Sequence, residues 1–211
     1  FTDNDIRGNK YFGAKIIPAR GVWIEFETEA DGAMYVRIDR KRKFPASSLI
    51  RILADLAGKK LEAEDMEKLF ADKGVDINYI KATLAKDHAK TPEDAYVEVY
   101  KRLRDSDLAT AANSKEFVSS LFTREKYDFS VVGRLRFNER FGLPIDEKAR
   151  EKRTIDLDDI IMILSQVVTL NTTKGAKADD IDHLGFRRIR SIGEMLQQKL
   201  KVGMTQMKRN I

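Results

Sequence analysis

The strongest constraint on the fold is a change of hydrophobic period at Phe44-Pro45. Before this point, apolar and polar residues alternate with a period of two, which is typical of strands with one buried face. After it, apolar residues recur at helical spacing toward the C-terminus. The sequence therefore predicts an α+β fold: an N-terminal β-hairpin or small antiparallel sheet, then a mostly helical region with a long C-terminal helix.

The residues before Phe44 predict strands over 11–17, 22–27 and 34–39. Asp31-Gly32 is a turn signal between the last two, so we expect these strands to form a hairpin. Because side chains alternate between the two faces of a strand, one face of this hairpin is apolar. The residues expected on that face are Val22, Ile24, Phe26, Met34, Val36 and Ile38.

The only tryptophan, Trp23, falls on the opposite face of this hairpin, among Glu25, Glu27 and Arg37. A tryptophan with charged neighbours is either covered by another element of the fold or available to a ligand. An available indole ring is suited to stacking on a nucleobase. The residues alone leave both possibilities open.

Start and stop signals divide the rest of the chain into helices. Thr91-Pro92-Glu93-Asp94 has the pattern of a helix start, and Asp156 precedes the most regular apolar stripe in the sequence. Residues 104–113 and 171–178 have the composition of loops. The expected helices cover residues 45–57, 61–71, 77–86, 91–103, 114–122, 130–141, 156–168 and 191–211.

Composition excludes several classes of protein. The 211 residues include no cysteine, which excludes disulfides, cysteine-ligated zinc or iron–sulfur clusters, and a thiol nucleophile. The longest apolar run, 160–164, is too short to span a membrane, and the polar N-terminal residues lead us to expect no signal peptide. With 35% charged residues, the composition is that of a soluble protein.

The net charge of +5 is concentrated at one end of the chain. Residues 182–211 hold seven basic and two acidic residues and so account for the whole excess. A second basic run lies at 37–43. Localised positive charge favours a polyanionic partner such as nucleic acid, although a solvated basic face has the same composition.

No phosphate-binding loop, dinucleotide fingerprint, nucleophile elbow or zinc-protease motif is present. Asp179, Asp180, Asp182 and His183 have side chains that can bind a divalent cation, so one hypothesis is a metal-dependent nuclease. The arginines that follow at 187–190 make internal Asp–Arg pairs the alternative. A third possibility is a polar strip that recognises phosphates and guanine edges.

Four segments resemble the family of bacterial RNA polymerase β subunits, and they occur in the family's order: 20–26, 36–45, 124–134 and 179–194. The resemblance implies that residues 1–181 are the lobe domain and residues 182–211 are the connector and returning helix of the protrusion domain. Family members are far longer, so we expect this chain to be an internal part of such a subunit. The central region, 58–113, matches weakly and receives no role.

The resemblance also implies a function. The chain would be part of a DNA-directed RNA polymerase, a nucleotidyltransferase, in which the lobe forms a wall of the DNA cleft. Its expected partners are non-template and downstream DNA, the rest of the β subunit, and the β′, α and σ subunits, with no membrane. No catalytic residue, metal or cofactor is expected in this chain, because the catalytic Mg²⁺ belongs to β′. The expected location is the bacterial cytoplasm, with the nucleoid.

The family's pocket for an unpaired non-template guanine maps onto Trp23, Ile181, Asp182 and Arg187. By this resemblance, Trp23 stacks on a base, Asp182 accepts from a guanine edge, and Arg187 positions base or backbone. Phe186 stands where the family usually has Asn, which predicts altered base specificity. Further backbone contacts are expected from Arg37, Arg40, Lys41, Arg42 and Arg134. The alternative to the polymerase hypothesis is a free-standing basic helical module that binds nucleic acid.

Overall fold

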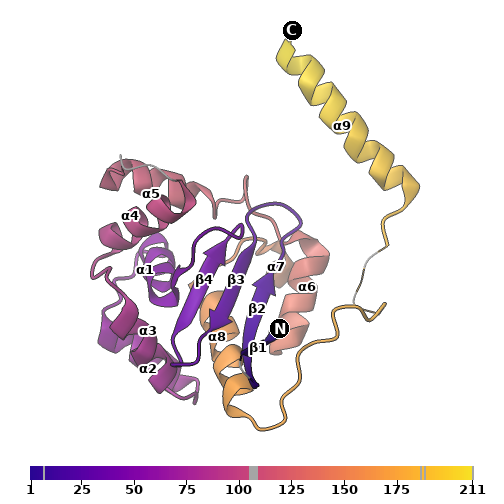
Figure 1. Ribbon diagram of the computed structural model, residues 1–211. Helices are drawn as coiled ribbons and strands as arrows, with labels where there is room; N and C mark the ends of the chain where they lie inside the picture. The colour runs from indigo at the N-terminus through magenta and orange to yellow at the C-terminus, as the bar shows by residue number, and fades with distance from the viewer. Residues whose placement is uncertain (7, 105–108, 186, 188, 211) are drawn as a thin grey trace. The chain divides into compact units, whose positions relative to one another are not determined.

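The computed structural model describes residues 1–6, 8–104, 109–185, 187 and 189–210. The predicted α+β class is confirmed: an antiparallel sheet is followed by helices, the last of which is long (Figure 1). The chain divides into two compact units, Phe1–Ala178 and Asp179–Ile211. None of the helices in the described residues has both the length and the apolar content needed to cross a lipid bilayer.

The sheet is a simple meander in which each strand pairs with its neighbour in sequence (Figure 1). It therefore needs only short connections, and every pairing is antiparallel. Its strands are β1 (Thr2–Ile6), β2 (Asn9–Ile16), β3 (Ile24–Thr28), β4 (Met34–Ile38) and β5 (Phe44–Pro45).

The predicted hairpin is formed by β3 and β4. Ile24 lies opposite Ile38 and Phe26 opposite Val36, so apolar side chains meet across the pair. The turn is closed by the N–H of Gly32, which donates to the carbonyl of Glu29 at 2.9 Å. Gly32 has a φ of 82°, which a glycine adopts without steric cost. The expected apolar face is buried, except that Val22 is only half-buried.

Helices follow the sheet largely where the sequence predicts them. Helix α5 begins earlier than predicted, α8 extends further, and the short α7 was not predicted. The helices are α1 (Ala46–Leu56), α2 (Ala63–Asp72), α3 (Asn78–Lys86), α4 (Pro92–Leu103), α5 (Ala111–Ser120), α6 (Ser130–Phe141), α7 (Glu147–Glu151), α8 (Leu157–Thr172) and α9 (Ile192–Asn210).

Helix α8 is hydrogen-bonded to the sheet through a side-chain amide, which pairs with the backbone of β2 as a neighbouring strand would. The N–H of Phe12 in β2 donates to Oδ1 of Asn171 at 2.9 Å, and Nδ2 of Asn171 donates to the carbonyl of Phe12 at 3.2 Å. Asn171 was expected in a loop but lies in the last turn of α8. The apolar stripe of α8 and the residues of α1 contribute to one core with the buried face of β3 and β4.

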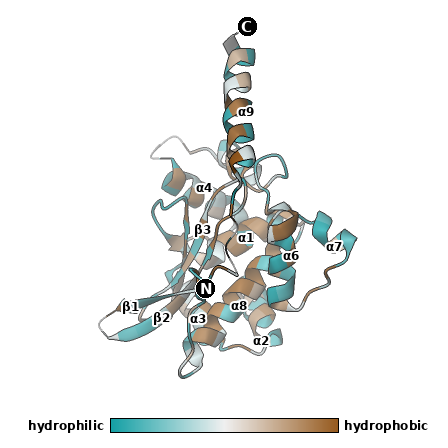
Figure 2. Cartoon of the chain, turned by 90° about the vertical axis from the view of Figure 1, so that its right-hand side faces the viewer, coloured by the Kyte–Doolittle hydropathy of each residue, from teal (hydrophilic) through white to brown (hydrophobic). Residues whose placement is uncertain are grey.

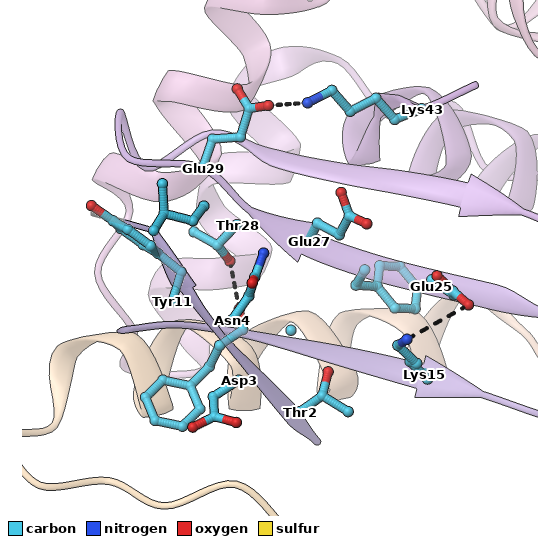
Figure 3. Close-up of a pocket in the computed structure, with 14 residues that line it drawn as sticks. Thr2, Asp3, Asn4, Tyr11, Lys15, Glu25, Glu27, Thr28, Glu29 and Lys43 are labelled. Atoms are coloured by element: carbon cyan, nitrogen blue, oxygen red, sulfur yellow. Dashed lines mark hydrogen bonds and ion pairs between the residues drawn. The ribbon is translucent and has the colours of Figure 1, made fainter. Parts of the chain in front are cut away.

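A polar pocket of about 520 Å³ lies among residues of β1, β2 and β3 (Figure 3). Its charges are matched within the fold: Lys15 lies 3.9 Å from Glu25, and Lys43 pairs with Glu29 (Figure 3). Because these carboxylates already have cationic partners, the pocket gives no chemical indication of a ligand. The interface that the sequence points to lies elsewhere, around Trp23.

Candidate nucleic-acid interface

The chain leaves β4 through a tight turn with unusual backbone angles. The N–H of Lys41 donates to the carbonyl of Ile38 at 3.0 Å, and the two residues between them, Asp39 and Arg40, have φ values of 49° and 59°. Positive φ at both central positions is the pattern of a type I′ turn, which favours Asn and Gly. Left-handed backbone costs an L-residue other than these about 1–2 kcal/mol.

This turn holds Trp23 through two backbone contacts. The N–H of Trp23 donates to Oδ1 of Asp39 at 2.7 Å, and the N–H of Asp39 donates to the carbonyl of Trp23 at 2.9 Å. The guanidinium carbon of Arg40 lies 5.0 Å from the centroid of the indole ring. Trp23 is half-buried. The backbone of Trp23 is therefore fixed by Asp39, and the cationic side chain of Arg40 lies over the indole ring.

The loop before Trp23 is attached to the segment that precedes α6. Arg20 and Asp128 exchange backbone hydrogen bonds at 3.1 and 2.8 Å. Gly21 has a φ of 122°, and a Cβ there would lie 2.9 Å from the carbonyl oxygen of Lys126. A side chain at this position would therefore push the loop away from its support.

Asp128 also holds this segment through its side chain. Nε of Arg153 donates to Oδ1 of Asp128 at 2.7 Å, and the N–H of Ser130 donates to the same oxygen at 2.7 Å. Burial acts to raise the pKa of Asp128, but the hydrogen bonds from Arg153 and Ser130 outweigh it, so the pKa is lowered. The carboxylate is thus ionised at neutral pH and anchors the Trp23 loop.

The predicted cations near Trp23 differ in what they already bind. Nε of Arg37 lies 2.9 Å from Oε1 of Glu27, so its charge is partly satisfied across the hairpin. Arg40, Lys41 and Arg42 are exposed, and no carboxylate in the described part of the chain lies within ion-pair distance of them. These three cations are available to neutralise phosphates.

The prediction that Arg134 contacts DNA is wrong. Its side chain is only 2% exposed and donates two hydrogen bonds of 3.0 Å to the two carboxylate oxygens of Asp159. The guanidinium also lies over the rings of Phe129 and Phe137. Arg134 therefore joins α6 to α8 inside the core and cannot reach a phosphate.

The remaining predicted residues lie in the second unit. Ile181, Asp182 and Arg187 are all exposed, and Nη1 of Arg187 donates to Oδ1 of Asp182 at 3.1 Å. The internal Asp–Arg pair, one of the sequence alternatives, is thus present. Trp23 lies in the first unit and Asp182 in the second, and a pocket shared by the two stays a prediction. Phe186 lies outside the described residues. The prediction of altered base specificity, which depends on Phe186, therefore stays a prediction.

The acidic cluster around Asp180 does not have the arrangement of a metal site. Among the residues that the structure describes, no three His, Cys, Asp or Glu side chains are placed to hold a metal ion together. One oxygen of Asp180 instead accepts from the N–H of Asp182 at 3.1 Å. The nuclease hypothesis therefore gains no support from the geometry.

Comparison with known proteins decides between the other two hypotheses. The family model for RNA polymerase Rpb2, domain 2, matches residues 2–190. The chain belongs to this family. The match includes residues 2–178 of the first unit and the segment that holds Asp182 and Arg187, and it favours the polymerase hypothesis over a free-standing module.

Bacterial relatives agree with this assignment to Rpb2 domain 2. The chain is 37% identical over 206 residues to the DNA-directed RNA polymerase subunit beta of Syntrophomonas wolfei, covering 97% of this chain and 17% of the relative. It is 35% identical over 227 residues to that of Chloroflexus aggregans, covering 96% of this chain and 18% of the relative. The predicted resemblance to bacterial β subunits is confirmed, and the chain spans less than a fifth of these relatives' length.

Sequence reasoning missed Asp39, which holds Trp23 in this Rpb2 domain. It placed Asp39 at the end of a strand, whereas β4 ends at Ile38. The available signal was the switch from alternation to five consecutive charged residues, 39–43, directly after a strand. Such a run is more typical of a turn than of a strand edge.

Proposed function

We propose that this chain is the lobe part of a DNA-directed RNA polymerase β subunit, and that it lines the DNA cleft against the non-template strand and downstream duplex. The observation that carries the proposal is the family match over residues 2–190 together with a half-buried indole beside three exposed cations, Arg40, Lys41 and Arg42, which have no ion-pair partner among the described residues. Aromatic rings beside cations are the usual means of holding single-stranded DNA without base pairing.

Each part of the interface has a distinct role in this proposal. Trp23 stacks on an unpaired base, so the interface binds single-stranded DNA more tightly than duplex DNA. Arg40, Lys41 and Arg42 neutralise the adjoining phosphates and set the strand's position without reading its sequence. Arg37, already bonded to Glu27, contributes less.

Asp182 and Arg187 supply the proposed base recognition. A carboxylate can accept from the N–H groups of a guanine edge, which no other base presents in the same way. For this, the 3.1 Å bond between Arg187 and Asp182 must open or be shared with the base. Both side chains are largely exposed, so this rearrangement breaks only a weak surface ion pair. Ile181 would contribute apolar contact to the same base.

The second unit is proposed to be the connector and returning helix of the protrusion domain. Apolar residues recur along α9 at helical spacing, and Figure 2 shows brown and teal alternating along it. These side chains are exposed, which suits a helix that packs against protein outside this chain. They are Ile192, Met195, Leu196, Leu200, Met204 and Met207.

In the proposed assembly, this chain contributes binding surface and no catalytic group. The magnesium chemistry of nucleotide transfer would come from the β′ subunit, and α and σ would complete the enzyme. We propose the bacterial cytoplasm, in association with the nucleoid, as the location. These roles depend on the rest of the β subunit as well.

The test compares single-stranded oligonucleotide binding by the wild-type chain and two variants. Trp23→Ala should weaken binding by about 1–3 kcal/mol through lost stacking, and Asp182→Ala should weaken it only for guanine-containing strands. Fluorescence anisotropy of labelled oligonucleotides measures both effects. The matched control is Tyr11→Ala, which removes another half-buried ring from the same sheet. Affinity unchanged by both Trp23→Ala and Asp182→Ala would contradict the proposal.

A further inference from the structure

We propose that Arg40 is a positioning residue of this interface: its guanidinium covers one face of Trp23, so that a single nucleobase stacks on the other face. This inference rests on the proposed function, because it concerns how the same site holds a base. It predicts that the site admits one unpaired base beside the indole and does not enclose the ring between two bases.

The first support is the residue type at position 40. Arg40 has a φ of 59° in a turn whose second central position favours glycine. A glycine there would be free of the left-handed strain that an arginine carries. Strain of this kind persists where the surrounding structure requires a particular side chain, and it is common at functional sites. At this position, the strained backbone carries a cationic side chain that lies over the indole ring.

The second support is that the turn and the ring are fixed to each other. Asp39 forms one hydrogen bond through its carboxylate and one through its N–H to the backbone of Trp23, at 2.7 and 2.9 Å. The backbone of the adjacent Arg40 is therefore fixed relative to the backbone of Trp23, and its guanidinium carbon lies 5.0 Å from the centroid of the indole ring. This distance lies within the range over which a cation is attracted to an aromatic face, about 6 Å from the centroid.

The third support is the charge of the Arg40 guanidinium. In the described part of the chain, no carboxylate lies within ion-pair distance of Arg40. Its charge therefore remains available to the phosphate next to the stacked base. Arg40 thus acts on the base through Trp23 and on the backbone directly, whereas Lys41 and Arg42 act on the backbone alone.

The experiment uses two probes of about ten nucleotides: a deoxythymidine strand and an abasic sugar-phosphate strand of equal length. The ratio of the two affinities isolates base stacking from phosphate contact. Because Trp23 is the only tryptophan, near-ultraviolet circular dichroism in the indole bands reports its immobilisation specifically. Arg40→Gly should retain or raise the unfolding midpoint, lower the affinity ratio at least about five-fold, and weaken the indole signal.

The matched control is Lys41→Gly, which removes a neighbouring charge of the same turn segment. It should weaken binding of both strands equally and leave the affinity ratio and the indole signal unchanged. Arg40→Asn serves as a second variant, because asparagine also tolerates left-handed backbone and removes the cation. It should reproduce the loss of ratio seen with Arg40→Gly.

Failure of the inference is distinguishable from failure of the proposed function. If Trp23→Ala keeps the preference for the deoxythymidine strand, the stacking function is wrong and the inference falls with it. If Trp23→Ala loses that preference while Arg40→Gly and Arg40→Asn keep both the preference and the indole signal, only the role of Arg40 is overturned.

Discussion

Two arginines in this domain make the same contact with an aromatic ring in opposite environments. The guanidinium carbon of Arg134 lies 5.0 Å from the centroid of Phe137, and that of Arg40 lies 5.0 Å from that of Trp23. Arg134 is buried and bonded through two nitrogens to Asp159, whereas Arg40 is exposed in a strained turn. Contact with a ring therefore does not distinguish a buried structural arginine from one exposed to solvent.

The difference lies in the counter-charge. A buried guanidinium is tolerated only with a well-placed carboxylate, because moving an unpaired charge out of water costs several kcal/mol. Asp159 meets this need from the first turn of α8, where its position is fixed by the capping box with Asp156. The guanidinium of Arg40 remains solvated by water and needs no carboxylate partner, so its charge stays free to interact with an anion.

The largest expected effect is at the buried pair. Arg134→Met leaves Asp159 in the core with Lys152, at 3.2 Å, as its one remaining ion-pair partner among the described residues. We expect a loss of about 3–5 kcal/mol in the free energy of unfolding, measured by guanidinium chloride denaturation. Arg40→Met, the matched exposed change, should stay within about 0.5 kcal/mol of wild type.

A double variant sharpens this comparison. Adding Asp159→Asn to Arg134→Met removes the stranded charge and should recover part of the lost stability. Equal losses for Arg134→Met and Arg40→Met would break the comparison, since both arginines would then be structural.

Sequence reasoning succeeds where the determining residues are close together in the chain. The hairpin of β3 and β4, the bounds of α6 and the start of α8 follow from local patterns of period two, period 3.6 and capping residues. The pair of Asp182 and Arg187 was anticipated because the two residues are only five apart. Helix α7, with five residues, is too short to present an apolar stripe.

Sequence reasoning fails where the partner is distant. Asp159 lies 25 residues from Arg134, and nothing near Arg134 in the sequence reveals that it is buried. Asp39 lies 16 residues from Trp23, and its hydrogen bonds to the Trp23 backbone depend on hairpin register and turn geometry together. The cations of 37–42 could be assigned to an interface as a group, but only the fold separates Arg37, bonded to Glu27, from Arg40.

Asp128 and Arg153 form an intermediate case between the two arginines. Asp128→Asn removes the charge-assisted bonds from Arg153, and we expect a loss of about 1–3 kcal/mol in unfolding free energy at pH 7. The pKa of Asp128 is lowered from its ordinary 3.8, so its contribution is fully present above pH 3.8 and is lost as the pH falls below it.

Denaturation at pH 7, 5 and 3, values chosen to bracket the ordinary carboxyl range of about 4, checks this dependence. The difference between wild type and Asp128→Asn should be the same at the two higher pH values and smaller at the lowest. A difference that stays constant over all three would mean that hydrogen-bond geometry, rather than the charge of Asp128, supports the Trp23 loop.

The smallest expected effect is at Lys41, an exposed cation beside Arg40. Lys41→Ala should leave stability unchanged and reduce the slope of log affinity against log salt by about 0.7, the value for one phosphate contact on a single strand. The control is Lys148→Ala, which removes an exposed cation from α7. The salt slope counts cations that contact a phosphate, and we expect Lys148 to lie outside the interface. The control should therefore leave the slope unchanged. Equal changes of slope in both variants would mean that the domain attracts DNA through its overall charge, and that the turn after β4 has no special place in binding.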